Sequence, residues 1–220
     1  MKAIELVNND VPPIRVDEMV KKAISWMEEF KVNHLPVVKS GVFQGILSEE
    51  MVLDHNDSNS LISEFNFIGK QQFVSENAHL YRVMFMLANH KLSIVPVCDE
   101  NKKFIGAISG LHLVNVLSRQ TGFNQPGAII VLQMNSLDFQ MSQISQIIES
   151  NNTKILAFYT ETFEDNNQLR VTIKLNQSKM GPILQTFSRY DYNVHEVYID
   201  DQMENEFQSR YDHLMNYLNL

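Results

Sequence analysis

Two stretches of the chain carry the same order of apolar and polar positions, about 60 residues apart. The first runs from His34 to Ser48: an apolar segment, a polar turn at Lys39–Gly41, and a second apolar segment. The second, Ser93 to Ser109, repeats this order with a turn that is one residue longer. Apolar segments joined by a short polar turn predict β-hairpins, so the hairpin is duplicated.

The duplication extends upstream of both hairpins. Apolar residues at i, i+3, i+4 and i+7 predict one buried helix face in each copy: Val20, Ala23, Ile24, Met27 and, 60 residues later, Leu80, Val83, Met84, Leu87. An extended lead-in precedes each helix, at 10–16 and 65–73, and Asp17 and Asn77 stand where N-caps belong. Two copies are too few for a solenoid, so we expect two βαββα halves around one core.

The copied unit ends in Gly-Ile-Leu-Ser in the first half and Gly-Ala-Ile-Ser in the second, and each serine opens a helix. Together with the prolines in matching strands, this resembles the cystathionine-β-synthase (CBS) type domain pair. The resemblance covers residues 1–121, with repeats at about 1–60 and 61–121. It implies a regulatory module whose repeats pack by pseudo-twofold symmetry around clefts that hold an adenosine compound in many relatives.

After a predicted linker at 122–127, the pattern changes. Strands and helices are expected in the order βαββαβ over 128–200, including one strand in which Leu169, Val171, Ile173 and Leu175 alternate with polar residues. This order is that of a ferredoxin-like fold, and after a CBS pair it resembles an ACT-type domain. The fold class is therefore α+β. The whole order resembles bacterial acetoin utilization proteins of the B type.

The ACT-type resemblance implies a ligand loop between the first strand and helix. This loop contains Asn135, Asp138 and Phe139 and lacks a glycine, so Asp138 is expected as an N-cap and Phe139 as a filling side chain. Dimerisation is therefore favoured over amino-acid binding. The segment 201–220 has an amphipathic helical pattern and is expected to dock on its own domain or on a partner subunit.

Composition narrows the function classes. A net charge of -8 without clustered Lys and Arg argues against a nucleic-acid partner. No apolar run is long enough to cross a membrane, no signal peptide is expected, and the single cysteine, Cys98, excludes an intrachain disulfide. We therefore expect a cytoplasmic protein. No catalytic motif or metal-ligand spacing is evident, so we expect neither an enzyme nor a metal site.

Binding is the remaining chemistry. In the CBS family a Ser or Thr at the end of the second hairpin strand contacts phosphate, and an Asp three residues later holds the ribose. The serines are present as Ser48 and Ser109, but Met51 and His112 occupy the aspartate positions. The resemblance places the remaining cleft residues in the lead-in strand and the hairpins: Ile14, His34, Pro36, Ile94 and Pro96.

Two hypotheses follow. The first is a homodimeric regulatory protein that senses a metabolite, with AMP, ADP, ATP and S-adenosylmethionine as candidate ligands and no tightly bound cofactor. The second is a ligandless scaffold, or a subunit that modulates a separate enzyme or transporter. The missing aspartates are consistent with the second hypothesis, and His112 offers a substitute contact for the first.

Overall fold

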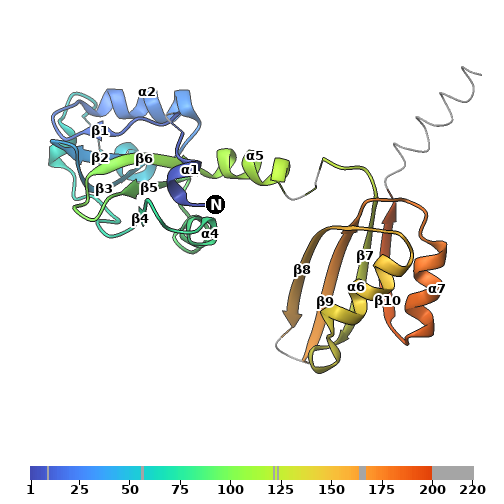
Figure 1. Ribbon diagram of the computed structural model, residues 1–220. Helices are drawn as coiled ribbons and strands as arrows, with labels where there is room; N and C mark the ends of the chain where they lie inside the picture. The colour runs from blue at the N-terminus through green and yellow to red at the C-terminus, as the bar shows by residue number, and fades with distance from the viewer. Residues whose placement is uncertain (9, 56, 121, 123, 164–166, 200–220) are drawn as a thin grey trace, which may run out of the picture. The chain divides into compact units, whose positions relative to one another are not determined.

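The computed structural model describes all residues except 9, 56, 121, 123, 164–166 and 200–220 (Figure 1). The chain divides into two compact units, Met1–Leu117 and Ser118–Leu220. Each unit has its own hydrophobic core, and we describe them separately.

The N-terminal unit contains the duplicated element order that the sequence predicts. The first copy comprises β1 (Ile14–Arg15), α2 (Val20–Phe30), β2 (His34–Lys39), β3 (Val42–Ser48) and α3 (Glu49–Leu53). The second comprises β4 (Val74–Ser75), α4 (Leu80–Asn89), β5 (Ile94–Cys98), β6 (Phe104–Ser109) and α5 (Gly110–Gln120). Each copy forms a three-stranded sheet, in the orders β1-β2-β3 and β4-β5-β6. In both, the lead-in strand is parallel to its neighbour and the hairpin is antiparallel.

The buried face of helix α2 is narrower than the sequence pattern predicts. Val20, Ala23 and Met27 are buried, but Ile24 is 39% exposed. In helix α4 the third buried residue is Met86, and Met84 is 40% exposed. The i+4 position of each stripe is therefore partly exposed.

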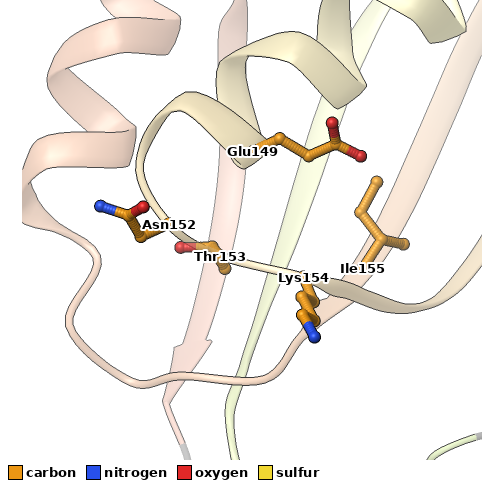
Figure 2. A pocket seen from close by; sticks show the side chains of 5 residues that line it. All are labelled: Glu149, Asn152, Thr153, Lys154 and Ile155. Atoms are coloured by element: carbon orange, nitrogen blue, oxygen red, sulfur yellow. The ribbon is translucent and has the colours of Figure 1, made fainter.

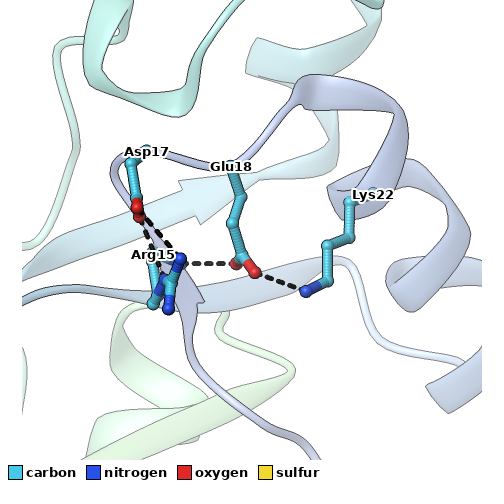
Figure 3. Close-up of polar contacts among 4 residues, drawn as sticks. All are labelled: Arg15, Asp17, Glu18 and Lys22. Atoms are coloured by element: carbon cyan, nitrogen blue, oxygen red, sulfur yellow. Dashed lines mark hydrogen bonds and ion pairs between the residues drawn. The ribbon is translucent and has the colours of Figure 1, made fainter.

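Neither predicted N-cap performs that role. Helix α2 begins after Met19, and Asp17 instead pairs with Arg15 at 2.9 Å (Figure 3). Glu18 organises this turn: it accepts from the backbone N–H of Arg15 at 2.8 Å and pairs with Lys22 (Figure 3). These contacts lie close to the surface, so each contributes little to the free energy of unfolding.

Helix α4 begins after His79 rather than at Asn77. The Nδ1 atom of His79 accepts from the backbone N–H of Tyr81 at 3.3 Å. An imidazole acceptor therefore takes the place that the sequence assigns to an asparagine.

The segments that precede the two lead-in strands, which we call the crossing segments, are exchanged between the repeats. Helix α1 (Ala3–Leu6) buries Leu6 in the core of the second repeat, and the N–H of Ala3 donates to the carbonyl of Ala78 at 2.8 Å. The corresponding segment of the second repeat, with the 3-10 helix η1 (Ile62–Glu64), buries Ile62 in the core of the first repeat. The expected lead-in strand at 65–73 is therefore wrong, since β4 begins only at Val74.

Glycines in the two hairpins permit this exchange. A Cβ atom on Gly45 would lie 2.7 Å from the Cβ of Phe67 and 2.8 Å from the carbonyl oxygen of Ile68. A Cβ atom on Gly106 would lie 2.3 Å from Val7 Cγ1. Each crossing segment thus packs directly against the backbone of the opposite repeat's second hairpin strand.

A third cluster joins the two repeats. It consists of Phe43, Ile46, Leu92 and Cys98, with Phe73, Leu87 and Phe104 packed against them. Cys98 is buried and free, and burial raises the pKa of its thiol to about 12. The expected single core is therefore wrong: each repeat has its own core, and this smaller cluster packs residues of both repeats together.

The C-terminal unit consists of β7 (Ala128–Asn135), α6 (Met141–Ser150), β8 (Ile155–Phe163), β9 (Gln168–Leu175), α7 (Gly181–Arg189) and β10 (Asn193–Ile199). Its strands form one antiparallel sheet in the order β10-β7-β9-β8. The predicted alternation in β9 is confirmed, because Leu169, Val171, Ile173 and Leu175 are all buried under the helices. Segment 201–220 lies outside the described residues.

Candidate ligand cleft

The repeats meet through hydrogen bonds at the start of their hairpins. The N–H of Ser93 donates to Nδ1 of His34 at 3.2 Å, and the N–H of Asn33 donates to the Ser93 hydroxyl at 3.0 Å. Burial lowers the pKa of His34, and the nearby Glu49 carboxylate partly opposes this shift. The neutral imidazole, which can accept from Ser93, is therefore the favoured form.

A pair of equivalent backbone contacts continues this symmetry. The N–H of Glu49 donates to the carbonyl of Asn33 at 2.8 Å, and the N–H of Gly110 donates to the carbonyl of Ser93 at 3.0 Å. The first residue of α3 and of α5 is thus tied to the start of the adjacent hairpin in the same way. Both repeats therefore share this pair of backbone contacts.

A cavity of about 320 Å³ lies beside this junction in the second repeat. Two predicted ligand residues, Ser109 and His112, line it. The Ser109 hydroxyl accepts from the backbone N–H of His112 at 3.2 Å, so it caps α5. The remaining lining residues come from both repeats: Asp10, Val11, Phe30, Lys31, Val32, Ser93, Gly110, Leu111 and Asn115.

Several of these lining residues were missed in the sequence. Phe30 and Lys31 stand at the end of α2, where Lys31 is in the left-handed conformation with φ of 54°. Lys91 occupies the equivalent place after α4, with φ of 51°. A left-handed residue ends each helix, and in the first repeat it lies at the cleft. The 60-residue offset relates Lys31 to Lys91 in the sequence, but it does not indicate that Lys31 lines a cleft.

The lining combines groups suited to an anionic ligand with an apolar part. Lys31 brings a positive charge and His112 can donate a hydrogen bond, while Phe30 and Leu111 contribute apolar surface. The N-terminus of α5 adds the positive end of a helix dipole beside Ser109. Asp10 is a carboxylate that could accept hydrogen bonds from hydroxyl groups.

The corresponding region of the first repeat has different side chains. Ser48 is almost buried and accepts from the backbone N–H of Met51 at 3.3 Å, while Met51 packs against the first repeat's core. Glu49 and Glu50 stand where the second repeat has Gly110 and Leu111. These carboxylates oppose an anion at Ser48.

The other predicted CBS-type residues lie in the strands. Ile14 and Ile94 are fully buried in the first repeat's core. Pro36 and Pro96 occupy equivalent ladder positions, opposite Ile46 and Ala107. None of these four lines the 320 Å³ cavity.

The predicted ACT-type loop has an internal structural role. The Asn135 side chain accepts from the N–H of Leu137 at 3.0 Å, and Phe139 packs against the core, with its ring centroid 6.0 Å from that of Phe158. The expectation that Asp138 caps α6 is wrong, since this helix begins after Gln140. Phe139 fills space near the loop, as expected.

The C-terminal unit also contains a pocket of about 560 Å³, away from this loop (Figure 2). It lies at the connection between α6 and β8, and its lining residues are Glu149, Asn152, Thr153, Lys154 and Ile155 (Figure 2). Thr153 is buried and bonded to Gln177 and to the carbonyl of Asn151. This pocket has one charge of each sign and no set of converging donors.

Within the described part of the chain, no helix combines the length and apolar character needed to span a membrane. The same residues contain no cluster of three or more His, Cys, Asp or Glu side chains arranged to hold a metal ion.

The CBS domain family model matches residues 3–57 and 67–119. The N-terminal unit is therefore a tandem pair of CBS domains.

Three solved structures are similar to this part of the chain. A CBS domain pair/ACT domain protein from Thermotoga maritima is 24% identical, with a TM-score of 0.49 over 54% of this chain and 98% of that chain. The protein CBSX2, in complex with AMP, is 17% identical, with a TM-score of 0.46 over 54% and 96%. The CBS domain pair of protein MJ0100, in complex with 5′-methylthioadenosine and S-adenosyl-L-methionine, is 19% identical, with a TM-score of 0.44 over 54% and 97%.

Proposed function

We propose that this protein is a non-catalytic regulator that senses an adenine nucleotide in the cleft of its second CBS repeat. The main support is the 320 Å³ cavity at the junction of the repeats, which is lined by Lys31, Ser109 and His112. In this proposal Lys31 and the start of α5 attract the phosphate, and Phe30 covers the base. His112 stands at the position of the family's ribose-binding aspartate. In this proposal Asp10 instead accepts hydrogen bonds from the ribose hydroxyls.

Titration calorimetry with AMP, ADP, ATP and S-adenosylmethionine tests this proposal, with adenosine as a probe that lacks phosphate. We expect a nucleotide to bind at one site per chain and adenosine to bind more weakly. Lys31→Ala should lower the affinity about tenfold or more, because a hydrogen bond to a charged group contributes about 1.5–3 kcal/mol. Lys91→Ala is the matched control, since it occupies the same position after α4 and should leave the affinity unchanged.

A second pair of variants tests the residues whose backbone N–H groups donate to Ser109 and Ser48. His112→Ala should weaken binding, whereas Met51→Ala, at the equivalent position of the first repeat, should affect stability rather than affinity. If a folded protein gives no binding heat with any of these compounds, the sensor proposal is rejected. The scaffold or regulatory-subunit function would then be the better explanation of the fold.

We assign the C-terminal unit to the ferredoxin-like ACT-type class, on the support of its βαββαβ order and its strand order β10-β7-β9-β8. Phe139 packs into the core beside the loop where the class binds amino acids, which favours a role in dimerisation. A homodimer of the full chain is therefore part of the proposal, and sedimentation equilibrium tests it. One buried, free cysteine is consistent with a reducing compartment such as the cytoplasm.

A further inference from the structure

The sheet of the C-terminal unit has one face under helices and one face that points away from them. Helices α6 and α7 lie on the same side of the sheet (Figure 1), and the core forms between them and alternate residues of the strands. Because side chains alternate along a strand, the residues between these core positions point to the other side, which we call the open face. The strand pairing places these residues on it: Ile129, Val131, Tyr159, Thr172, Lys174, Glu196 and Tyr198.

Apolar side chains cross the middle of the open face. In one row of paired residues, Tyr198 of β10 lies opposite Ile129 of β7. In the next row, Val131 of β7 pairs with Thr172 of β9, which pairs with Tyr159 of β8. Tyr159 and Tyr198 are 61% and 54% exposed. The two edge strands therefore each present an exposed aromatic ring beside the apolar residues of β7.

The segment 201–220 follows the edge strand β10 after a single residue. Its sequence predicts an amphipathic helix with an apolar stripe on one side: Met203, Phe207, Tyr211, Leu214 and Leu218. A helix of 20 residues is about 30 Å long. The strands contain seven to nine residues, or about 24–31 Å. The segment is therefore long enough to run back along the whole open face.

The charges of the segment match those of the open face in one direction. Glu204 and Arg210 flank the apolar stripe on opposite sides, about 9 Å apart along a helix axis. Lys174 of β9 and Glu196 of β10 lie in neighbouring rows, about 7 Å apart along the strands. Because βαβ connections are right-handed, an α-helix that runs back from β10 over β7 turns its Glu204 side towards β9 and its Arg210 side towards β10. Each charge would then meet its opposite.

We infer that residues 201–220 pack as a helix on the open face of their own sheet, with the apolar stripe against Ile129, Val131 and the two tyrosines. An isolated helix of this length is only marginally stable in water, so burial of the stripe supplies most of its stability. The two ion pairs lie near the surface and fix the direction of the helix more than they stabilise it. The inference depends neither on nucleotide binding nor on the proposed homodimer.

Cysteine labelling of the full chain tests whether the open face is covered. Tyr159→Cys lies on this face, and Tyr190→Cys, after α7, is a control whose parent side chain is similarly exposed in the structure. A bulky maleimide should react about tenfold more slowly with Tyr159→Cys, which corresponds to about 1.4 kcal/mol for release of the helix. Cys98 does not compete, because its thiol is buried and has a pKa of about 12.

Changes within the segment show whether it is responsible for the protection. Phe207→Asp with Leu214→Asp places charge in the apolar stripe and should raise the labelling rate of Tyr159→Cys to that of Tyr190→Cys. Asn205→Asp with Asn216→Asp adds the same charge on the opposite side of the predicted helix and should leave the rate unchanged. Equal rates for the two cysteines in the parent chain would overturn the inference, as would protection that persists after the stripe is disrupted.

Crosslinking distinguishes packing on the same chain from packing on a partner. Glu196→Cys and Arg210→Cys combined in one chain should be joined by a short bismaleimide within that chain. Tyr190→Cys with Arg210→Cys should give no such product, because Tyr190 follows a helix on the other side of the sheet. A crosslinked dimer from a mixture of the two single variants Glu196→Cys and Arg210→Cys would overturn packing on the same chain. The proposed homodimer is measured separately by sedimentation, so it can fail while this inference stands.

Discussion

The two CBS repeats share the backbone contacts at the start of their hairpins and differ in the side chains around them. Both tie the first residue of the helix after the hairpin to the start of that hairpin, and both have a serine whose hydroxyl caps that helix. After Ser48 the first repeat continues with Glu49 and Glu50, whereas after Ser109 the second has Gly110 and Leu111. The shared contacts thus maintain the fold, and the differences determine what each surface can bind.

This comparison is the basis for proposing the cleft of the second repeat as the ligand site. The second repeat combines a cavity, a lysine contributed by the first repeat and a helix N-terminus without carboxylates. The first repeat uses Met51 in its core and surrounds Ser48 with negative charge. The two clefts therefore differ through a few residues at equivalent positions.

The largest expected effect comes from breaking the exchange of crossing segments that both repeats share. Leu6→Ala and Ile62→Ala should each lower the free energy of unfolding by about 3 kcal/mol, since each removes a fully buried side chain from the opposite repeat's core. Urea unfolding followed by the fluorescence of Trp26 measures this. Ile4→Ala and Leu61→Ala, at exposed neighbouring positions, should cost much less, and equal losses would contradict the exchanged packing.

A smaller effect is expected where the crossing segments meet the hairpins. Gly45→Ala should cost about 2 kcal/mol, because its Cβ would clash with a backbone carbonyl as well as with Phe67. Gly106→Ala should cost less, since it meets only the side chain of Val7. Gly110→Ala, with no neighbour closer than 3.9 Å, is the control in the same unfolding experiment. A Gly106 variant less stable than the Gly45 variant would reverse the comparison.

The charge difference between the clefts can be tested by exchanging equivalent residues. Gly110→Glu gives the second repeat the carboxylate of the first and should weaken nucleotide binding about tenfold, or 1.4 kcal/mol, through repulsion of the phosphate. A glutamate near a helix N-terminus is well tolerated, so folding should be preserved. Glu49→Gly is the reverse exchange in the first repeat. Calorimetry should show that Glu49→Gly leaves the affinity for the nucleotide unchanged. A loss of affinity as large as that of Gly110→Glu would show that the nucleotide binds elsewhere.

The smallest expected effect concerns pH. Burial lowers the pKa of His34 in the folded protein, so as the pH falls through the ordinary histidine value of 6.5 the unfolded chain takes up the proton first. Stability is therefore fully present above that pH and declines below it, until the pH reaches the lowered folded value. His34→Ile, which installs the equivalent residue of the second repeat, should flatten the profile between pH 7 and 5. Parallel urea profiles for both proteins would contradict this assignment.

The sequence was sufficient for elements whose pattern is local. Both hairpins, the helices and the alternation in β9 follow from spacing, whereas the lead-in strand expected at 65–73 is wrong, since β4 spans only Val74–Ser75. The exchange of the crossing segments could not be predicted in this way, because Leu6 and Ile62 would fit the core of either repeat by polarity alone. Only the three-dimensional positions of Gly45 and Gly106 show which backbone each segment crosses.

The candidate site was predicted in part for a related reason. Ser109 and His112 follow the hairpin motif, and the structure places both at one cavity. Lys31, Phe30 and Asp10 reach the same cavity from another repeat, so their spacing from Ser109 along the chain carries no signal. Met51 and His112 occupy equivalent positions in the sequence, but only packing shows that Met51 belongs to a core.

Lys31 and Val32 line both the ligand cavity and a groove between α2 and α3. A ligand that fixes this lysine also changes a wall of that groove. Binding events that share a residue are coupled, and the coupling free energy must be the same in both directions. A molecule bound in the groove would therefore alter ligand affinity by the same factor by which the ligand alters binding in the groove.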